Sequence, residues 1–235
     1  MSRPRAVVSW STGKDCAWAL HEVRTVGTVE VVGLLSTVSE TFGRVSIHGV
    51  RVEVAEAQAE ALGVPLYRVP IPYPCPNEVY ERAMGAATAR LRDDGVERIV
   101  FGDLFLEDIR RYRELRLDGS GLAPVFPLWG RPTAALAETM IRAGVVARIV
   151  SLDPARVPRE LAGRVLDRRT LAALPPGVDP CGENGEFHTC VTDGPMFAHP
   201  IPAVAGPVVE RDGFVYADLA LAPGGDDPTP AAPSP

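Results

Sequence analysis

Strand-like apolar runs alternate with helix-like segments from residue 6 to residue 152. This alternation constrains the possible folds more than any other feature of the sequence, because repeated β-α-β units build a parallel sheet with helices on both faces. The run at 29–36 is apolar throughout, which is typical of a strand that is buried on both sides. We therefore predict an α/β fold with a doubly wound, Rossmann-like parallel sheet, whose strands include the runs at 66–70, 98–103 and 145–152.

The character of the sequence changes after residue 152. A short helical stretch is followed by a Pro-Pro-Gly break, and Asp212-Gly213 between two alternating segments predicts a β-hairpin. We expect an α/β domain at 1–152 and a smaller α+β region at 153–221. Residues 222–235 are rich in proline, glycine and aspartate and carry too little apolar surface to fold, so a disordered tail is predicted.

Composition limits the possible partners and the cellular location. The net charge of -6 argues against nucleic acid as a partner. No signal peptide or membrane span follows the start of the chain, so cytoplasmic residence is expected. The four cysteines form no Cys-x-x-Cys pair, and neither a zinc ribbon nor an iron-sulfur site is predicted. The sequence is compatible with a homodimer.

A candidate anion site follows the first apolar run. Small residues and one glycine, Ser11-Thr12-Gly13, lead into Lys14-Asp15-Cys16 and a helical segment. A tight turn after a buried strand presents backbone N–H groups, and the helix adds its positive dipole end at the same place. The loop differs from the Walker pattern, since it has one glycine and an aspartate after the lysine.

This loop resembles the Ser-Gly-Gly-x-Asp-Ser signature of the PP-loop ATP pyrophosphatases, which split ATP into AMP and pyrophosphate. Two positions depart from the signature, because Thr12 replaces a glycine and Cys16 replaces the final serine. Threonine disfavours the positive φ angles that glycine permits. The cysteine thiol is a weaker hydrogen-bond donor than the hydroxyl that it replaces.

A second polar cluster lies at Cys181-Gly182-Glu183-Asn184-Gly185-Glu186-Phe187-His188-Thr189. A surface turn explains its glycines and Asn184 but not the gathering of two carboxylates with a histidine. Neighbouring carboxylates repel one another unless a metal, an ammonium ion or a cationic substrate group lies among them.

The second cluster narrows the resemblance. Together with Gly102-Asp103 and Pro127-Leu128-Trp129 it is similar to the diphthine-ammonia ligase branch of the PP-loop enzymes. That resemblance implies adenylation of a substrate carboxylate by ATP with Mg²⁺, followed by amidation with ammonia and release of AMP and pyrophosphate. In the branch the acceptor is a modified histidine of elongation factor 2; here the acceptor is an unidentified carboxylate.

The resemblance and the expected strand ends together define the predicted site. Asp15 is a candidate Mg²⁺ ligand, and Glu183, Glu186 or His188 is the expected ammonium binder or base, without a choice among them. The residues expected to act in catalysis are Lys14, Asp103, Glu183, Glu186 and His188. The residues expected to bind the nucleotide are Ser9, Trp10, Ser11, Thr12, Gly13, Lys14, Asp15, Cys16, Ser36, Thr37, His48, Gly102 and Asp103.

Two alternatives stay open at the level of sequence. A tRNA thiolation enzyme would need sulfur-carrier roles for Cys16 or Cys181. A non-catalytic adenine-nucleotide sensor would bind ATP without turnover, which the departures at Thr12 and Cys16 permit.

Overall fold

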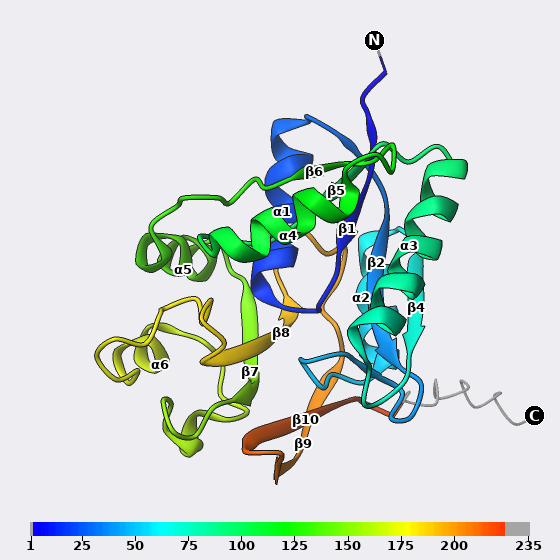
Figure 1. Ribbon diagram of the computed structural model, residues 1–235. Coiled ribbons are helices and arrows are strands. Elements are labelled where there is room, and N and C mark those ends of the chain that lie inside the picture. The colour runs from blue at the N-terminus through cyan, green and yellow to red at the C-terminus, as the bar shows by residue number, and fades with distance from the viewer. Residues whose placement is uncertain (1, 224–235) are drawn as a thin grey trace, which may run out of the picture.

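The computed structural model describes residues 2–223, and two sheets organise them (Figure 1). The predicted disordered tail lies outside the described residues from position 224 onward. The larger sheet has six strands in the order β3-β2-β1-β5-β6, with β4 also paired to β2. All of its pairings are parallel except that of β3 with β2. Its strands are β1 (Arg5–Ser9), β2 (Glu30–Ser39), β3 (Arg44–Val45), β4 (Leu66–Ile71), β5 (Arg98–Val100) and β6 (Ala123–Val125).

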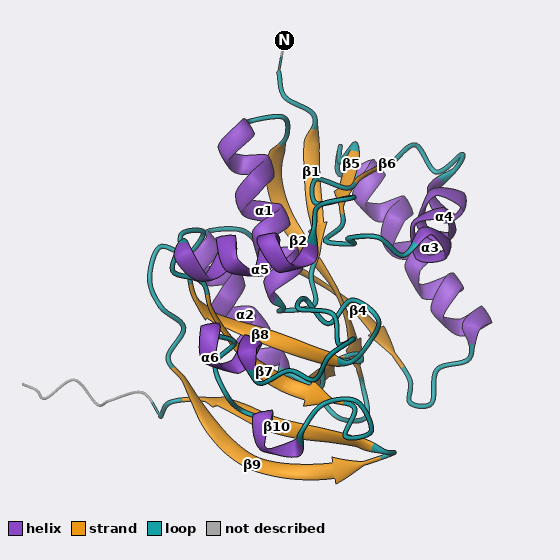
Figure 2. Cartoon of the chain, turned by 90° about the vertical axis from the view of Figure 1, so that its left-hand side faces the viewer, coloured by secondary structure: helices purple, strands orange, loops and turns teal. Residues whose placement is uncertain are grey.

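Helices cover both faces of this sheet, which confirms the predicted doubly wound α/β architecture. In Figure 2, α1 and α5 lie on one side of the strands, and α3 and α4 lie on the other. Successive residues of β1 point to opposite cores, since Ala6 and Val8 pack with α1 whereas Val7 packs near Leu91 of α3. The helices are α1 (Lys14–Val26), α2 (Val52–Leu62), α3 (Asn77–Asp93), α4 (Glu107–Leu117) and α5 (Thr133–Arg142).

The smaller sheet is antiparallel, with the order β8-β7-β10-β9. Its last two strands form the predicted hairpin, in which Arg211 pairs with Phe214 and Asp212-Gly213 make the turn with φ angles of 51° and 82°. Such positive angles are those of the type I′ turn that Asp-Gly favours. The elements are β7 (Val146–Leu152), a 3₁₀ turn (Arg159–Leu161), α6 (Arg168–Ala172), β8 (Phe187–Asp193), β9 (Ala203–Arg211) and β10 (Phe214–Leu221).

One predicted strand belongs to a different sheet. The run at 145–152 was expected to continue the parallel sheet, but β7 pairs antiparallel with β8 and β10. Its apolar character comes from burial on both faces, as expected, because Val150 and Ile149 are buried in separate hydrophobic clusters. Burial on both faces does not specify which sheet a strand joins. The domain division at residue 152 stays a prediction, and the pairing of β7 favours an earlier boundary.

Residues 2–223 contain no helix with both the length and the apolar character needed to cross a bilayer.

Candidate active site

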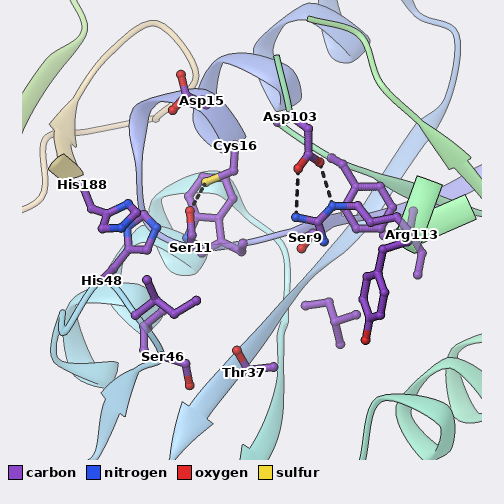
Figure 3. A pocket seen from close by; sticks show the side chains of 18 of the residues that line it. Ser9, Ser11, Asp15, Cys16, Thr37, Ser46, His48, Asp103, Arg113 and His188 are labelled. Carbon is purple, nitrogen blue, oxygen red and sulfur yellow. Dashed lines mark hydrogen bonds and ion pairs between the residues drawn. The ribbon is translucent and has the colours of Figure 1, made fainter. Parts of the chain in front are cut away.

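A cavity of about 490 Å³ lies at the carboxyl ends of the parallel strands, where α/β folds bind their ligands (Figure 3). Its wall combines both sheets. The larger sheet contributes the loop after β1, the segment 45–48 and residues 101–103, and the smaller sheet contributes residues 181–183 and 187–189. Helices α3 and α4 close a further side with Tyr80, Met84, Tyr112 and Arg113. The cavity therefore brings the two sequence clusters together.

The loop before α1 adopts a conformation that its threonine disfavours. Thr12 has a φ of 73°, in the left-handed region, and its side chain is fully buried. The carbonyl of Thr12 accepts hydrogen bonds from Val191 N (2.9 Å) and Gln58 Nε2 (3.2 Å). A left-handed residue other than glycine costs about 1–2 kcal/mol, so these contacts maintain a strained turn. The loop thus keeps a shape that glycine would adopt without strain.

The start of α1 remains available to an anion. Gly13 is the N-cap residue and provides no side-chain cap, and a β-carbon there would lie 3.2 Å from His48 Cε1. The thiol of Cys16 donates to Gly13 O at 3.1 Å and lies 3.5 Å from Ser11 Oγ. Thr189 Oγ1 accepts from the first N–H of the helix, that of Lys14, and the N–H groups that follow, at a helix end that lines the cavity, suit phosphate.

Lys14 joins the loop to the second cluster. Its buried Nζ lies 2.7 Å from Asp15 Oδ2 and also donates to the carbonyl of Cys181, while its backbone N donates to Thr189 Oγ1 at 3.1 Å. Burial is the largest effect and opposes the charge, but Asp15, Cys181 and Glu183 together raise the pKa of Lys14 above 10.5. Burial raises the pKa of Asp15. Lys14 is the only lysine in the sequence.

Asp15 has the features of a Mg²⁺ ligand. Its Oδ1 is buried and has no hydrogen-bond partner among the described residues. Within residues 2–223 no group of three or more histidine, cysteine, aspartate or glutamate side chains forms a metal cage. Magnesium is commonly held by one or two carboxylates together with substrate phosphates, so a single free carboxylate oxygen at the start of α1 fits the ion.

Gly102 allows the end of β5 to approach α1 closely. A β-carbon at this position would lie 2.7 Å from Asp15 C and from Cys16 N, both of which are backbone atoms. Next to it, Asp103 is 9% exposed and forms an ion pair with Arg113, whose Nε lies 2.8 Å from Oδ2. Arg113 also lies over the Phe101 ring at 4.4 Å. Asp103 thus reaches the cavity as predicted but is paired with an arginine.

Glu183 is the carboxylate of the second cluster that reaches the cavity. Its Oε1 accepts a hydrogen bond from Leu104 N at 2.7 Å. Burial raises its pKa to about 7, and the nearby Asp15 and Asp103 carboxylates act in the same direction. A carboxyl group with this pKa exchanges a proton readily near neutral pH.

Glu186 does not line the cavity, although the sequence placed it among the catalytic residues. Its side chain is fully buried and lies 2.8 Å from Arg156 Nη2, and it accepts hydrogen bonds from Asp179 N and Asn184 Nδ2 at 3.1 Å each. The carboxylate faces the inside of its own loop because Gly182 and Gly185, with φ angles of 72° and 81°, turn the chain around it. The geometry gives Glu186 the role of organising the loop.

Two histidine rings lie against each other at one side of the cavity (Figure 3). The rings of His48 and His188 have centroids 4.4 Å apart, and His48 Nδ1 lies 3.4 Å from Thr189 O. Burial, followed by the proximity of His188, lowers the pKa of His48 well below 6.5. Burial, followed by Lys14, lowers the pKa of His188 to about 4. Both rings are therefore neutral at pH 7 and can each donate and accept a hydrogen bond.

Most residues of the predicted site do line the cavity. Thr12, Gly13, Ser36 and Glu186 are the exceptions, and the first three lie directly behind the wall. The lining residues that were predicted are Ser9, Trp10, Ser11, Lys14, Asp15, Cys16, Thr37, His48, Gly102, Asp103, Glu183 and His188.

Sequence reasoning missed two positions that shape the site. Gln58 is completely buried; its Oε1 accepts from Trp10 Nε1 at 2.8 Å, and its Nε2 donates to Val191 O at 2.7 Å. A glutamine on the apolar face of its helix was the available signal, since a buried amide needs partners. Arg113 was missed because it lies in an arginine-rich helix whose sequence is typical of a solvent-exposed helix.

Two known protein-family domains match the two parts of the chain that form the cavity. Residues 4–122 match the diphthamide synthase N-terminal domain, and residues 132–211 match the diphthamide synthase C-terminal domain. The chain belongs to the diphthamide synthase family. The resemblance drawn from the two motifs is thereby confirmed, and β7 falls inside the second matched segment.

A curated relative is similar over a large part of the chain. The bovine (Bos taurus) diphthine–ammonia ligase is 28% identical over 178 residues, which cover 69% of this chain and 66% of that protein. The match thus spans slightly less than two thirds of the relative. Residues 212–223, with the turn of the hairpin and β10, lie beyond both matched family segments.

Proposed function

We propose that the protein is an ATP-dependent ligase that joins ammonia to a substrate carboxylate. The observation that carries this proposal is the meeting of the phosphate loop with Glu183 in one cavity. The substrate carboxylate attacks the α-phosphorus of ATP and pyrophosphate leaves; ammonia then attacks the acyl carbon and AMP leaves. The similarity to diphthine–ammonia ligase supports this reaction class.

The cavity offers a separate place for each part of ATP. The start of α1, where the N-cap residue Gly13 has no side chain, and the buried ammonium group of Lys14 suit the triphosphate. Magnesium, when bound through Asp15 Oδ1, neutralises phosphate charge. Met84, Ile99 and Phe101 line an apolar portion that suits the flat adenine ring.

Glu183 is the residue that we assign to ammonia. Ammonium must lose a proton before its nitrogen can attack, and the acceptor of that proton works best when its pKa is near the operating pH. Glu183, with a pKa of about 7, meets this condition, whereas His188, with a pKa of about 4, is a much weaker base. Glu186 lies outside the cavity.

The cysteines favour amide ligation over thiolation. A sulfur carrier acts as a thiolate. Burial raises the pKa of Cys16 to about 11 and that of Cys181 to about 12, so both thiols hold their protons at pH 7.

Product analysis tests the reaction. The protein is incubated with ATP, ammonium and elongation factor 2 carrying diphthine, and the nucleotides are separated. AMP and pyrophosphate that form only when ammonium and the acceptor are both present would support the proposal. ADP as the product would contradict it, and ATP binding without any turnover would favour the sensor.

The single lysine offers an independent test of the nucleotide position. An acyl-phosphate derivative of ATP transfers its acyl group to a lysine beside the triphosphate, and here Lys14 is the only lysine available. We expect acylation of Lys14 that excess ATP prevents, and a Lys14→Ala variant with weakened ATP binding. Unchanged ATP affinity in Lys14→Ala would contradict the placement of the phosphates.

A further inference from the structure

One wall of the cavity is a short loop that starts in β3 of the larger sheet, where Val45 pairs with Val38 of β2 and Ser46 N donates to Thr37 O at 3.0 Å. These contacts hold the start of the loop. Residues 44–51 form a closed loop in which Val45 N donates to Val50 O and Gly49 N donates to Val45 O. Its tip carries Ser46, Ile47 and His48 to the cavity. Ile47 is 76% exposed with a φ of 68°, which is unfavourable for a β-branched residue. A strained tip of this kind needs external support.

The support comes from β10 of the other sheet. Asp218 Oδ1 accepts from Arg44 Nη1 at 2.8 Å, and Asp218 Oδ2 accepts from Arg51 Nη2 at 2.8 Å and from Arg51 Nε at 3.1 Å. Arg44 also donates to Gly49 O at 2.6 Å. The Asp218 side chain is 11% exposed, so these bonds are partly shielded from water. One carboxylate therefore ties both ends of the loop to the smaller sheet.

The two arginines would repel each other without this carboxylate. Arg44 and Arg51 face each other as an isolated antiparallel bridge at the base of the loop. Like charges directly opposite each other destabilise such a pair. Asp218 lies in contact with both guanidinium groups, and these bonds hold its pKa below the usual 3.8 although burial opposes ionisation. A neutral residue at 218 would leave two cations at the loop base.

Neighbouring glycines make room for the contact. A β-carbon on Gly206 of β9 would lie 3.1 Å from Asp218 Cβ, and a β-carbon on Gly49 would lie 3.0 Å from Tyr216 Cδ1. Tyr216 and Asp218 alternate with the buried Val215 and Ala217, so both point to the loop side of β10. The strand therefore presents one face to the core and the other to the loop.

We propose that Asp218 is a positioning residue that holds the 44–51 loop against β10 and thereby sets His48 opposite His188 in the cavity. Asp218 lies beyond both family-matched segments, which end at residue 211. The effect on catalysis rests on the proposed function, whereas the effect on the loop does not.

Hydrogen exchange and NMR test the positioning directly. In Asp218→Asn we expect the amides of Val45, Ser46 and Gly49 to exchange about tenfold faster or more, which corresponds to losing one hydrogen bond to a charged group. The ring protons of His48 and His188 should give a cross-relaxation signal in the unaltered protein that is lost in the variant. The sequence has only four histidines, which keeps the assignment simple.

A matched ion pair provides the control. Glu22 binds Arg131 in a bidentate pair at 2.7 and 3.0 Å, and neither residue lines the cavity. Glu22→Gln should leave exchange in the loop and the histidine signal unchanged. Arg51→Gln, which keeps the Arg44 contact, should give an intermediate effect and serves if Asp218→Asn does not fold.

Two results would overturn the proposal. One is an unchanged loop in both Asp218→Asn and Arg51→Gln, and the other is an equal response in Glu22→Gln. ATP affinity measured on the same samples separates this question from the ligase proposal. If the loop is displaced in Asp218→Asn but the unaltered protein forms no AMP, Asp218 is still a positioning residue and the ligase proposal is rejected.

Discussion

Thr12 and Glu183 both lie in environments that their side chains do not prefer. Thr12 holds a left-handed backbone conformation in a fully buried position. Glu183 is a carboxylic acid with a pKa of about 7 beside other acids. Both lie at or directly behind the cavity wall, where strain and shifted pKa values accompany function more often than folding.

The strain at Thr12 predicts that glycine is a more stable replacement than alanine there, which reverses the usual order at an unstrained position. Thr12→Gly should be about 1 kcal/mol more stable than Thr12→Ala, because relief of left-handed strain exceeds the entropic disadvantage of glycine. Denaturant unfolding measures the difference. The control is Ser36, which is buried in β2 and has no such angle; there Ala should be the more stable variant. Equal stability of the Thr12 pair would show that the loop relaxes in solution.

The pKa of Glu183 predicts a pH dependence of ligation. Because the base must be deprotonated, kcat/KM should fall about tenfold per pH unit below pH 7. Glu183→Gln should lower the rate by about 10²–10⁴-fold and remove this limb of the profile. Glu186→Gln should keep the limb while lowering stability, since it breaks the ion pair between the buried Glu186 carboxylate and Arg156. If the fall of kcat/KM below pH 7 persists in Glu183→Gln, the titrating base is another group.

Among the helices and strands, β5 and α1 are the two that bring the site together. The residues after β5 touch the start of α1 at Gly102. This contact brings Asp103 beside the start of the helix, and it exists only because position 102 has no side chain. Helices α3 and α4 contribute differently. Each has a single buried residue, Leu91 and Leu117, so their exposed faces are free to form the side wall of the cavity.

The contact between β5 and α1 predicts the effect of a single methyl group. Gly102→Ala should destabilise the protein by about 1–3 kcal/mol and weaken ATP binding, since backbone atoms at 2.7 Å must move apart. Gly85→Ala is the control. On α3 an added β-carbon meets nothing within 4 Å, and the helix should gain about 0.5–1 kcal/mol. Gly85 lines the cavity, so Gly85→Ala is a control for stability alone. Thermal unfolding of both variants and ATP titration of Gly102→Ala check the expectation, which fails if Gly102→Ala binds ATP normally.

For the whole molecule, the packing of the two sheets places groups together that are far apart in the chain. Gln58 bonds to Val191, Lys14 to Cys181, and Arg51 to Asp218. The histidine pair is formed in the same way, one ring from the 44–51 loop and one from β8. The site therefore depends on the complete tertiary structure.

The buried histidine pair predicts how stability depends on pH. The unfolded chain binds protons at histidine near pH 6.5, whereas folded His188 does so only near pH 4. The stabilisation is therefore complete above pH 6.5 and is lost as the pH falls from 6.5 toward 4. As the pH falls across this range, the free energy of unfolding of the unaltered protein should fall toward that of His188→Asn. A constant difference for His188→Asn would contradict the shifted pKa.

The sequence by itself determined the α/β class, the family motif before α1 and the second cluster, because these depend on local periodicity and on short motifs. It also identified Asp212-Gly213 as the hairpin turn, since turn geometry is set by neighbouring residues. Only the tertiary structure decided that β7 joins the smaller sheet, that Glu183 and not Glu186 faces the cavity, and that Gln58 and Asp218 support it. These outcomes depend on contacts between residues distant in sequence, which no local pattern encodes. The loop at Thr12 combines both kinds of information, since its motif is local but its strained shape is held by Gln58 and Val191.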